Sequence, residues 1–308
     1  MKAVIYCFSG TGNTRIVSDM VARELSKKNI ETDVFSFDYK SYSNTEYPSP
    51  SDYDIVGIAY PIYGFNAPYL VNRFVKKLCA SKTGQRAFVI KTSGEPFKMN
   101  NPSSSYIKRT LSKKGYNVTY EKHFLMPYNI MFRYPDALAK QMYCYADSYS
   151  TISAAKIAEG EKQLYKVGPF SAFASFICKL VWIGGPIIGL TYRAKKSKCT
   201  KCGLCARKCP MGNISMTKKD GRPKFNGHCM ICMRCVMKCP FDAINAGILN
   251  PWKVNGSYKF DEILANESIT SNFVNSNTKG YFKNFNVYFD SMDRDFESYG
   301  TKAPRSFS

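Results

Sequence analysis

Short apolar runs alternate with longer amphipathic stretches through the first 165 residues of the chain. The apolar runs predict strands at residues 3–8, 32–37, 54–60, 86–92 and 116–126. The stretches between them predict helices at residues 13–28, 67–80, 103–114 and 136–165. Apolar strands that alternate with helices favour a parallel sheet covered on both faces. The pattern therefore predicts an α/β fold for residues 1–165, with a doubly wound five-stranded parallel sheet.

A connecting segment at residues 166–195 is apolar along most of its length, and Lys179 is the one charge in its central part. The segment is long enough to span a bilayer. Its Gly184-Gly185-Pro186 sequence predicts a break after an apolar helix of about four turns, followed by a short return. Three alternatives stay open: packing against the first domain, contact with a membrane surface through residues 166–198, and a true span. Basic residues directly after the segment keep membrane contact among them.

Residues 196–248 contain a cysteine motif that occurs twice. The motif C-x2-C-x2-C-x3-C-P is formed by Cys199, Cys202, Cys205 and Cys209, and again by Cys229, Cys232, Cys235 and Cys239. In this spacing three cysteines of one run wrap a [4Fe–4S] cluster, and the last cysteine of the other run is its fourth ligand. The motif therefore predicts one cluster on Cys199, Cys202, Cys205 and Cys239, and another on Cys229, Cys232, Cys235 and Cys209. A pair of zinc sites is the alternative, although zinc sites rarely use this run with its proline.

The repeat resembles that of two-cluster bacterial ferredoxins, which implies a small α+β domain. The resemblance covers the cysteine-rich unit alone. One departure is visible, since Gly203 follows the second cysteine of the first run whereas Met233 does so in the second. That difference changes the packing over one cluster but leaves its ligating cysteines in place.

The last segment, residues 249–308, is rich in asparagine, serine and aromatic residues. We expect a partly ordered C-terminal tail here. The alternative is a short strand that docks elsewhere on the chain, because Phe285, Val287 and Phe289 alternate with polar residues.

The first predicted strand runs into a loop of hydroxyl and glycine residues before the first predicted helix. Glycine lets a backbone approach a ligand closely, and a helix N-terminus attracts negative charge. The loop has no Walker A lysine and lacks the later glycine of a dinucleotide-binding fingerprint. It resembles the phosphate-binding loop of flavodoxins, which implies that the FMN phosphate is bound by Ser9, Gly10, Thr11, Gly12, Asn13 and Thr14. Arg15 either neutralises that phosphate or points to solvent.

Two further loops should contact the flavin ring, because ligands of such folds bind at the carboxyl ends of the strands. By their resemblance to flavodoxin loops, they contribute Pro61, Tyr63 and Gly64 after the third strand, and Ser93, Gly94 and Glu95 after the fourth. Tyr63 is the candidate for stacking on the ring. Glu95 near the ring would disfavour an anionic reduced flavin. Residues 126–129, after the fifth strand, are a further candidate for closing this site.

Positive charge is concentrated where the cysteines are. The chain carries a net charge of +21, from 44 Lys+Arg and 23 Asp+Glu. Residues 193–238 hold 13 basic residues and 1 acidic residue, which is more than half of the excess. The basic stretch lacks interleaved stacking aromatics and no nucleic-acid motif is present, so we predict no nucleic-acid partner. We predict instead a redox protein partner with an acidic docking face.

Together the two units resemble flavodoxin–ferredoxin fusions of anaerobes. This resemblance implies an electron-transfer protein that passes electrons between FMN, two [4Fe–4S] clusters and external redox partners. The alternative is a flavin-dependent oxidoreductase that reduces a quinone, a nitro compound or oxygen with electrons delivered through the clusters. The sequence starts without a secretory signal pattern, and clustered cysteines suit a reducing compartment, so we expect a cytoplasmic location. The sequence does not indicate an oligomeric state.

Overall fold

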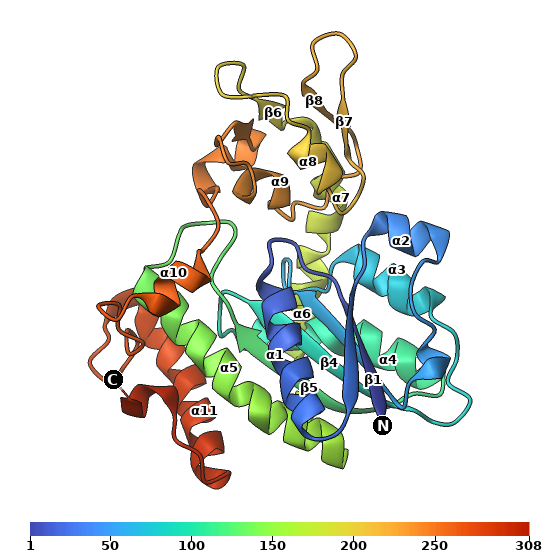
Figure 1. Ribbon diagram of the computed structural model, residues 1–308, viewed down its shortest axis with the longest axis vertical. Helices are drawn as coiled ribbons and strands as arrows, with labels where there is room; N and C mark the ends of the chain where they lie inside the picture. The colour runs from blue at the N-terminus through green and yellow to red at the C-terminus, as the bar shows by residue number, and fades with distance from the viewer. Residues whose placement is uncertain (308) are drawn as a thin grey trace.

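A five-stranded parallel sheet forms the base of the molecule, and the cysteine-rich unit lies above the carboxyl ends of its strands (Figure 1). The computed structural model describes residues 1–307, apart from the side chains of residues 181, 182, 306 and 307. The strands are β1 (Lys2–Cys7), β2 (Glu31–Ser36), β3 (Ile55–Pro61), β4 (Arg86–Ser93) and β5 (Asn117–Leu125). They pair in the order β2-β1-β3-β4-β5, which confirms the predicted doubly wound fold.

Helices cover both faces of the sheet. Successive residues of a strand point to opposite faces, so one strand contributes side chains to two cores. Ala3, Ile5 and Cys7 of β1 belong to the core under α1 (Asn13–Lys27) and α5 (Asp136–Glu159). The residues between them belong to a second core, under α3 (Tyr69–Lys77) and α4 (Ser105–Lys113). A short helix, α2 (Tyr39–Asn44), follows β2. The final helix of the domain, α5, ends at the left-handed Gly160, before the predicted end at residue 165.

The cysteine-rich unit is built from two similar halves. Each half contains a one-turn helix within its cysteine run, and these helices are α8 (Leu204–Arg207) and α9 (Arg234–Met237). Two short antiparallel pairs complete the unit: β6 (Arg193–Ala194) with β9 (Ile244–Asn245), and β7 (Ile214–Met216) with β8 (Pro223–Phe225). The residue before each helix is left-handed, with a φ of 70° at Gly203 and 58° at Met233. The backbone of the two halves is therefore alike although only one has glycine at this position.

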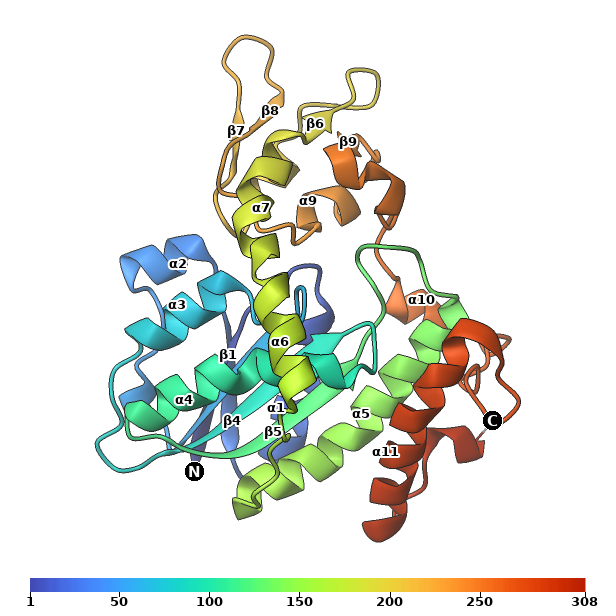
Figure 2. The ribbon, with the colours of Figure 1, turned by 180° about the vertical axis from the view of Figure 1, so that it is seen from behind.

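A continuous apolar helix connects the two parts and runs along the face seen in Figure 2. It consists of α6 (Pro169–Cys178) and α7 (Leu180–Leu190), joined at Lys179, whose backbone is itself helical. The predicted break at Gly184-Gly185-Pro186 is wrong, because Pro186 lies inside α7. Close packing of the neighbouring glycines on the loop around Cys229 holds the helix through this proline. By length and composition the run Pro169–Leu190 could cross a membrane, and 19% of its most apolar window is buried.

The C-terminal segment adds two helices, α10 (Phe260–Ala265) and α11 (Asn286–Ser298), which pack against α5. The strand predicted around Phe285 and Phe289 is wrong. Phe285, Phe289, Met292 and Phe296 recur at helical spacing and are all buried, whereas Val287 is 70% exposed. The segment therefore contributes to the core of the first domain, and residue 308 lies outside the described part.

Candidate functional site

The loops that follow β1, β3, β4 and β5 surround a cavity at the carboxyl edge of the sheet. Its volume is about 290 Å³, close to the lower end of the ~300–1,000 Å³ that is typical of small-molecule sites. The predicted flavin-binding residues other than Gly12 all line it, and these are Ser9, Gly10, Thr11, Asn13, Thr14, Pro61, Tyr63, Gly64, Ser93, Gly94 and Glu95. Three loops that are far apart in the sequence thus converge on one space.

The loop after β1 turns into α1 at Gly12, which has a φ of 127°. Residues with a Cβ rarely adopt this conformation, so the turn requires glycine. The Gly12 N–H donates to Ser9 Oγ (3.2 Å), and Asn13 Nδ2 donates to a carbonyl oxygen in the loop after β5 (2.8 Å). The Thr14 hydroxyl is buried and bonds that of Thr92 (2.7 Å). These side chains hold the loop in shape, and the start of a helix such as α1 is a position that favours an anion.

Arg15 extends away from this loop. Its guanidinium donates to Asp19 (2.8 Å), to the carbonyl oxygen of Val34 (3.2 Å) and to Ser36 Oγ (3.0 Å). These bonds connect α1 to β2. Arg15 was expected either to neutralise the phosphate or to point to solvent, and the structure supports the second alternative.

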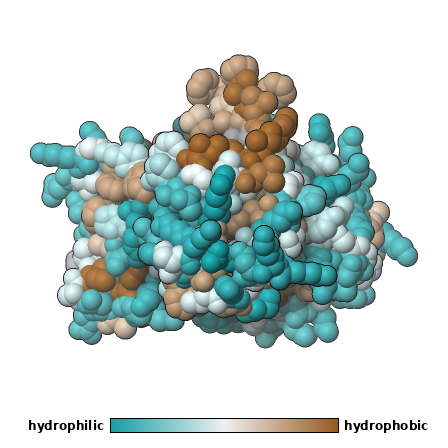
Figure 3. Space-filling view, turned by 90° about the horizontal axis from the view of Figure 1, so that it is seen from above, coloured by the Kyte–Doolittle hydropathy of each residue, from teal (hydrophilic) through white to brown (hydrophobic). Residues whose placement is uncertain are grey.

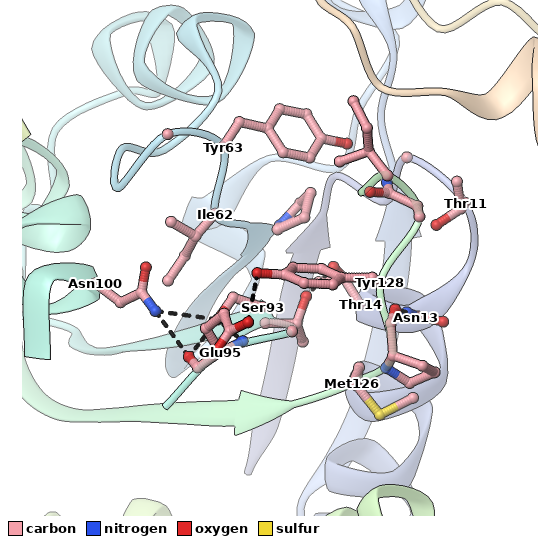
Figure 4. A pocket seen from close by; sticks show the side chains of 18 of the residues that line it. Thr11, Asn13, Thr14, Ile62, Tyr63, Ser93, Glu95, Asn100, Met126 and Tyr128 are labelled. Carbon is pink, nitrogen blue, oxygen red and sulfur yellow. Dashed lines mark hydrogen bonds between the residues drawn. The ribbon is translucent and has the colours of Figure 1, made fainter. Parts of the chain in front are cut away.

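Glu95 brings a carboxyl group into the cavity and is only 6% exposed. Its Oε1 accepts hydrogen bonds from the hydroxyls of Tyr128 (2.8 Å) and Tyr134 (3.3 Å), and its backbone carbonyl accepts one from Asn100 Nδ2 (2.9 Å; Figure 4). Burial raises the pKa of Glu95, and the two tyrosine hydroxyls oppose that rise. Asn100 and Tyr134 were not predicted, because neither belongs to a motif and only the fold brings them to this carboxyl group.

Two buried polar atoms in the cavity, Tyr63 Oη and Glu95 Oε2, have no hydrogen-bond partner within the described chain. Such atoms are rare in folded proteins and are usually satisfied by a ligand or water. Tyr63 reaches across to the phosphate loop, and a Cβ at Gly10 would lie 2.2 Å from its hydroxyl. The Tyr128 ring packs on Gly94 in a similar way. A flat ligand with hydrogen-bonding edges and a phosphate fits these residues, while stacking by Tyr63 in particular stays a prediction.

The second cysteine run lies directly against this cavity. Residues 230 and 231 line it together with the loops of the sheet. Arg234 donates from Nε to the carbonyl oxygen of Gly10 (2.5 Å) and from Nη2 to that of Ser9. No sequence pattern signals this contact, since it joins residues 224 positions apart. The contact places the cysteine-rich unit on the phosphate loop.

The structure arranges the eight motif cysteines in two sets. The outer set lines one small cavity and consists of Cys199, Cys202, Cys205 and Cys239. The inner set consists of Cys209, Cys229, Cys232 and Cys235. Within the inner set, burial raises the pKa of Cys229, Cys232 and Cys235, and neighbouring thiols of the set raise it further. Each set takes three cysteines from one run and the last from the other, the grouping that cross-ligated clusters require.

The surroundings of the last cysteine of each run repeat in both halves. Asn213 N donates to Cys209 Sγ, and Ala243 N donates to Cys239 Sγ, each at 3.3 Å.

The two sets differ in their surroundings. Cys202 of the outer set is exposed, whereas Cys232 of the inner set is buried. The helix α7 also covers the inner set, since a Cβ at Gly189 would lie 2.1 Å from Cys229 Cβ. The outer set therefore faces solvent, and the inner set lies between the cavity and α7.

Sequence comparisons match the cysteine-rich unit. Residues 198–243 match the family model described as a 4Fe-4S dicluster domain. The chain is 32% identical to NADH-quinone oxidoreductase subunit I 2 of Symbiobacterium thermophilum over 27% of its own length and 41% of that subunit. It is 47% identical to NADP-reducing hydrogenase subunit HndC of Solidesulfovibrio fructosivorans over 18% of its own length and 11% of that subunit. The chain thus spans less than half of either curated relative.

Structural comparisons match about half of the chain. The flavodoxin of Streptococcus pneumonia TIGR4 aligns over 52% of this chain and 99% of its own, at 17% identity and a TM-score of 0.38. The general stress protein 14 of Treponema denticola, solved in complex with FMN, aligns over 52% of this chain and 100% of its own, at 11% identity and a TM-score of 0.37.

The match to a dicluster domain confirms the predicted two [4Fe–4S] clusters. The order of the parallel strands confirms the flavodoxin-like fold of the first domain. The chain therefore joins a flavodoxin-like domain to a two-cluster ferredoxin domain, an architecture for electron transfer.

Proposed function

We propose that the protein transfers electrons between FMN, bound in the cavity, and two [4Fe–4S] clusters, and exchanges them with external redox partners. FMN accepts one or two electrons when bound, whereas each cluster passes electrons singly. The observation that carries this proposal is the contact of Arg234 with the carbonyl oxygens of Ser9 and Gly10. Because that contact fixes the inner set against the phosphate loop, it supports direct exchange between the inner cluster and the flavin.

The residues of the cavity fit FMN in their chemistry. The N–H groups at the start of α1 and the Thr11 hydroxyl would bind the phosphate. Tyr63 and Tyr128 border the space for the ring, with an unpartnered hydroxyl on Tyr63. Glu95 holds a proton more readily than an exposed carboxyl group, because burial raises its pKa. These side chains would orient the ring and keep water from it.

The different exposure of the two sets supports an order of transfer. Cys202 is exposed, so the outer cluster would exchange electrons with external partners. The inner set touches the flavin cavity through residues 230 and 231, so the inner cluster would exchange electrons with FMN. The two clusters would then connect the protein surface to the buried flavin.

An anaerobic reductive titration, followed by visible and paramagnetic-resonance spectra, tests the proposal. The purified protein should contain one flavin and about eight irons per chain. After rapid reduction of the clusters, Arg234→Gln should slow flavin reduction roughly tenfold, because it removes charged hydrogen bonds to the phosphate loop. Lys224→Gln removes the same charge at an exposed position of β8, far from the cavity, and serves as the control. A colourless zinc protein, or equal flavin reduction in both variants, contradicts the proposal.

Reduction of a small substrate at the flavin is the second candidate, and Glu95 favours it. Its carboxyl group is buried, has a raised pKa and leaves Oε2 unpartnered among the described residues. Reduction of a quinone, a nitro compound or oxygen consumes protons, which such a group can hold. Saturable turnover of one of these substrates would favour the oxidoreductase, and exchange with protein carriers alone would favour the electron carrier.

We also propose that external redox partners carry an acidic face, which docks on this protein beside the outer set of cysteines. Lys201, Arg207 and Lys208 are exposed there. Stopped-flow rates of cluster reduction by an acidic ferredoxin should therefore fall roughly tenfold from low to high ionic strength. Rates that do not depend on salt would contradict a charged docking face. A cytoplasmic location stays a prediction.

A further inference from the structure

The helix formed by α6 and α7 carries its large apolar side chains on the outside. Phe170, Phe173, Phe176, Leu180, Ile183 and Ile187 are each between 64% and 73% exposed. Small residues face the protein instead, and Ser175, Gly185 and Gly189 are buried. The usual pattern of a surface helix is therefore reversed, because its bulky apolar side chains are the ones left in water.

The small residues are what fix the helix in this orientation. Ser175 and Asn66 bond twice, from Ser175 Oγ to Asn66 Oδ1 (2.9 Å) and from Asn66 Nδ2 to the Ser175 carbonyl (2.8 Å). At the other end, Cβ atoms added at Gly185 and Gly189 would lie 3.0 Å from the Cys229 carbonyl oxygen and 2.1 Å from Cys229 Cβ. A rotation that buried the phenylalanines would place bulky side chains in these close contacts. The apolar face is therefore not available to cover the protein itself.

The two domains that the helix connects lie on the same side of any surface it could bind. They touch directly, through Arg234 on Ser9 and Gly10, and through Tyr39 N donating to the Pro210 carbonyl (2.8 Å). A helix that crossed a bilayer would separate its two ends and break these contacts. The geometry points to a helix that lies on a surface and leaves both domains on one side.

Positive charge borders the apolar face at several places. Lys166 precedes the helix, Lys179 lies at its middle, and Arg193, Lys196 and Lys198 follow it, all of them exposed. In the view of Figure 3 the largest group of hydrophobic side chains projects as a ridge at the edge of the molecule, and hydrophilic side chains cover most of the rest. An apolar ridge bordered by lysine and arginine matches the acyl chains and the anionic headgroups of a lipid leaflet.

We propose that α6–α7 binds the surface of a membrane that contains anionic lipids. Its phenylalanine, leucine and isoleucine side chains would insert among the acyl chains, and the flanking cations would contact the headgroups. Binding would hold the protein flat on one leaflet, with the inner set of cysteines directly behind α7. This inference does not rest on the proposed electron transfer, because it needs only the fold and the exposed residues.

Vesicle flotation with the full-length holoprotein tests the proposal. Vesicles of phosphatidylcholine and phosphatidylglycerol in equal parts should carry the protein, and vesicles of phosphatidylcholine alone should bind roughly tenfold less. Phe173→Ser with Ile183→Ser should abolish flotation, whereas Val287→Ser with Tyr299→Ser, which are 70% and 39% exposed at α11, should leave it unchanged. Cluster absorbance should stay the same in both variants, since all four residues lie on the surface.

Three results would overturn the proposal. Absence of binding to either vesicle would show that lipid does not cover the helix. Equal binding by the two serine variants would show that the ridge is not the contact. A dimer in solution that becomes a monomer with Phe173→Ser and Ile183→Ser, without vesicle binding by the dimer, would assign the ridge to a second copy of this chain.

Discussion

Replacement of Cys209 by alanine lowers the iron content of the anaerobically purified protein from about eight atoms per chain to about four. Cys209 belongs to the first run in sequence, but its thiol lies with those of Cys229, Cys232 and Cys235. Loss of this ligand should therefore remove the inner cluster and leave the outer one. Cys144→Ala is the matched control, because Cys144 lies on α5 outside both sets and should keep all the iron.

An iron chelator identifies which cluster remains. In Cys209→Ala the remaining cluster is the outer one, and its exposed ligand Cys202 should make it easy to strip. The mirror variant Cys239→Ala should retain the inner cluster, which is enclosed between the cavity and α7 and should resist the same chelator. The opposite pattern, with a protected cluster in Cys209→Ala, would mean that each run holds its own cluster and would contradict cross-ligation.

The parts of the molecule that sequence predicted well depend on local chemistry. The strands β1 and β3 are nearly continuous apolar runs, and β4 contains one at residues 87–90, because both faces of a parallel sheet are buried. The cysteine spacing follows from how a short loop wraps a cluster, so it can be read without the fold. The loop at Gly12 combines a turn that needs glycine with the start of a helix, and its residue pattern shows both.

The parts that sequence missed depend on contacts between distant segments. Pro186 is tolerated inside α7 because Gly185 and Gly189 pack on the loop of Cys229, which no local pattern indicates. Phe289 alternates with its neighbours like a strand residue, but α5 offers it a helical packing partner. Arg234 carries no motif, and its position over the phosphate loop exists only after both domains fold.

Replacement of Glu121 by leucine destabilises the flavodoxin-like domain by about 3–5 kcal/mol, because it leaves a buried ammonium group without its counter-charge. Glu121 and Lys91 have fully buried side chains 3.5 Å apart. The carboxylate also accepts hydrogen bonds from Lys108 Nζ (2.5 Å) and from Ser104 Oγ (2.5 Å). The midpoint of the far-UV thermal transition should fall clearly below that of wild type.

Two further variants separate loss of the pair from a general packing defect. Lys91→Met combined with Glu121→Leu removes both charges and should recover most of the stability, since a buried pair can be replaced by apolar residues of similar volume. Glu262→Leu breaks the exposed pair of Lys259 and Glu262 and should cost at most about 1 kcal/mol. A double variant as unstable as Glu121→Leu would show that the lost hydrogen bonds to the carboxylate, and not the unpaired charge, are responsible.

The loss of stability of Glu121→Leu relative to wild type should become smaller as the pH rises. Burial lowers the pKa of Lys91 to about 8, and the charge of Glu121 opposes that decrease. Without Glu121 the pKa of Lys91 falls further in the folded chain, while in the unfolded chain it stays near 10.5. The folded variant therefore releases the Lys91 proton at a lower pH than folded wild type does. Between that lower pKa and about 8 the stability of the variant rises with pH faster than that of wild type, and above about 8 Lys91 is neutral in both folded chains. Thermal midpoints that approach wild type at high pH would establish Lys91 as the destabilised group, and a constant deficit would contradict that assignment.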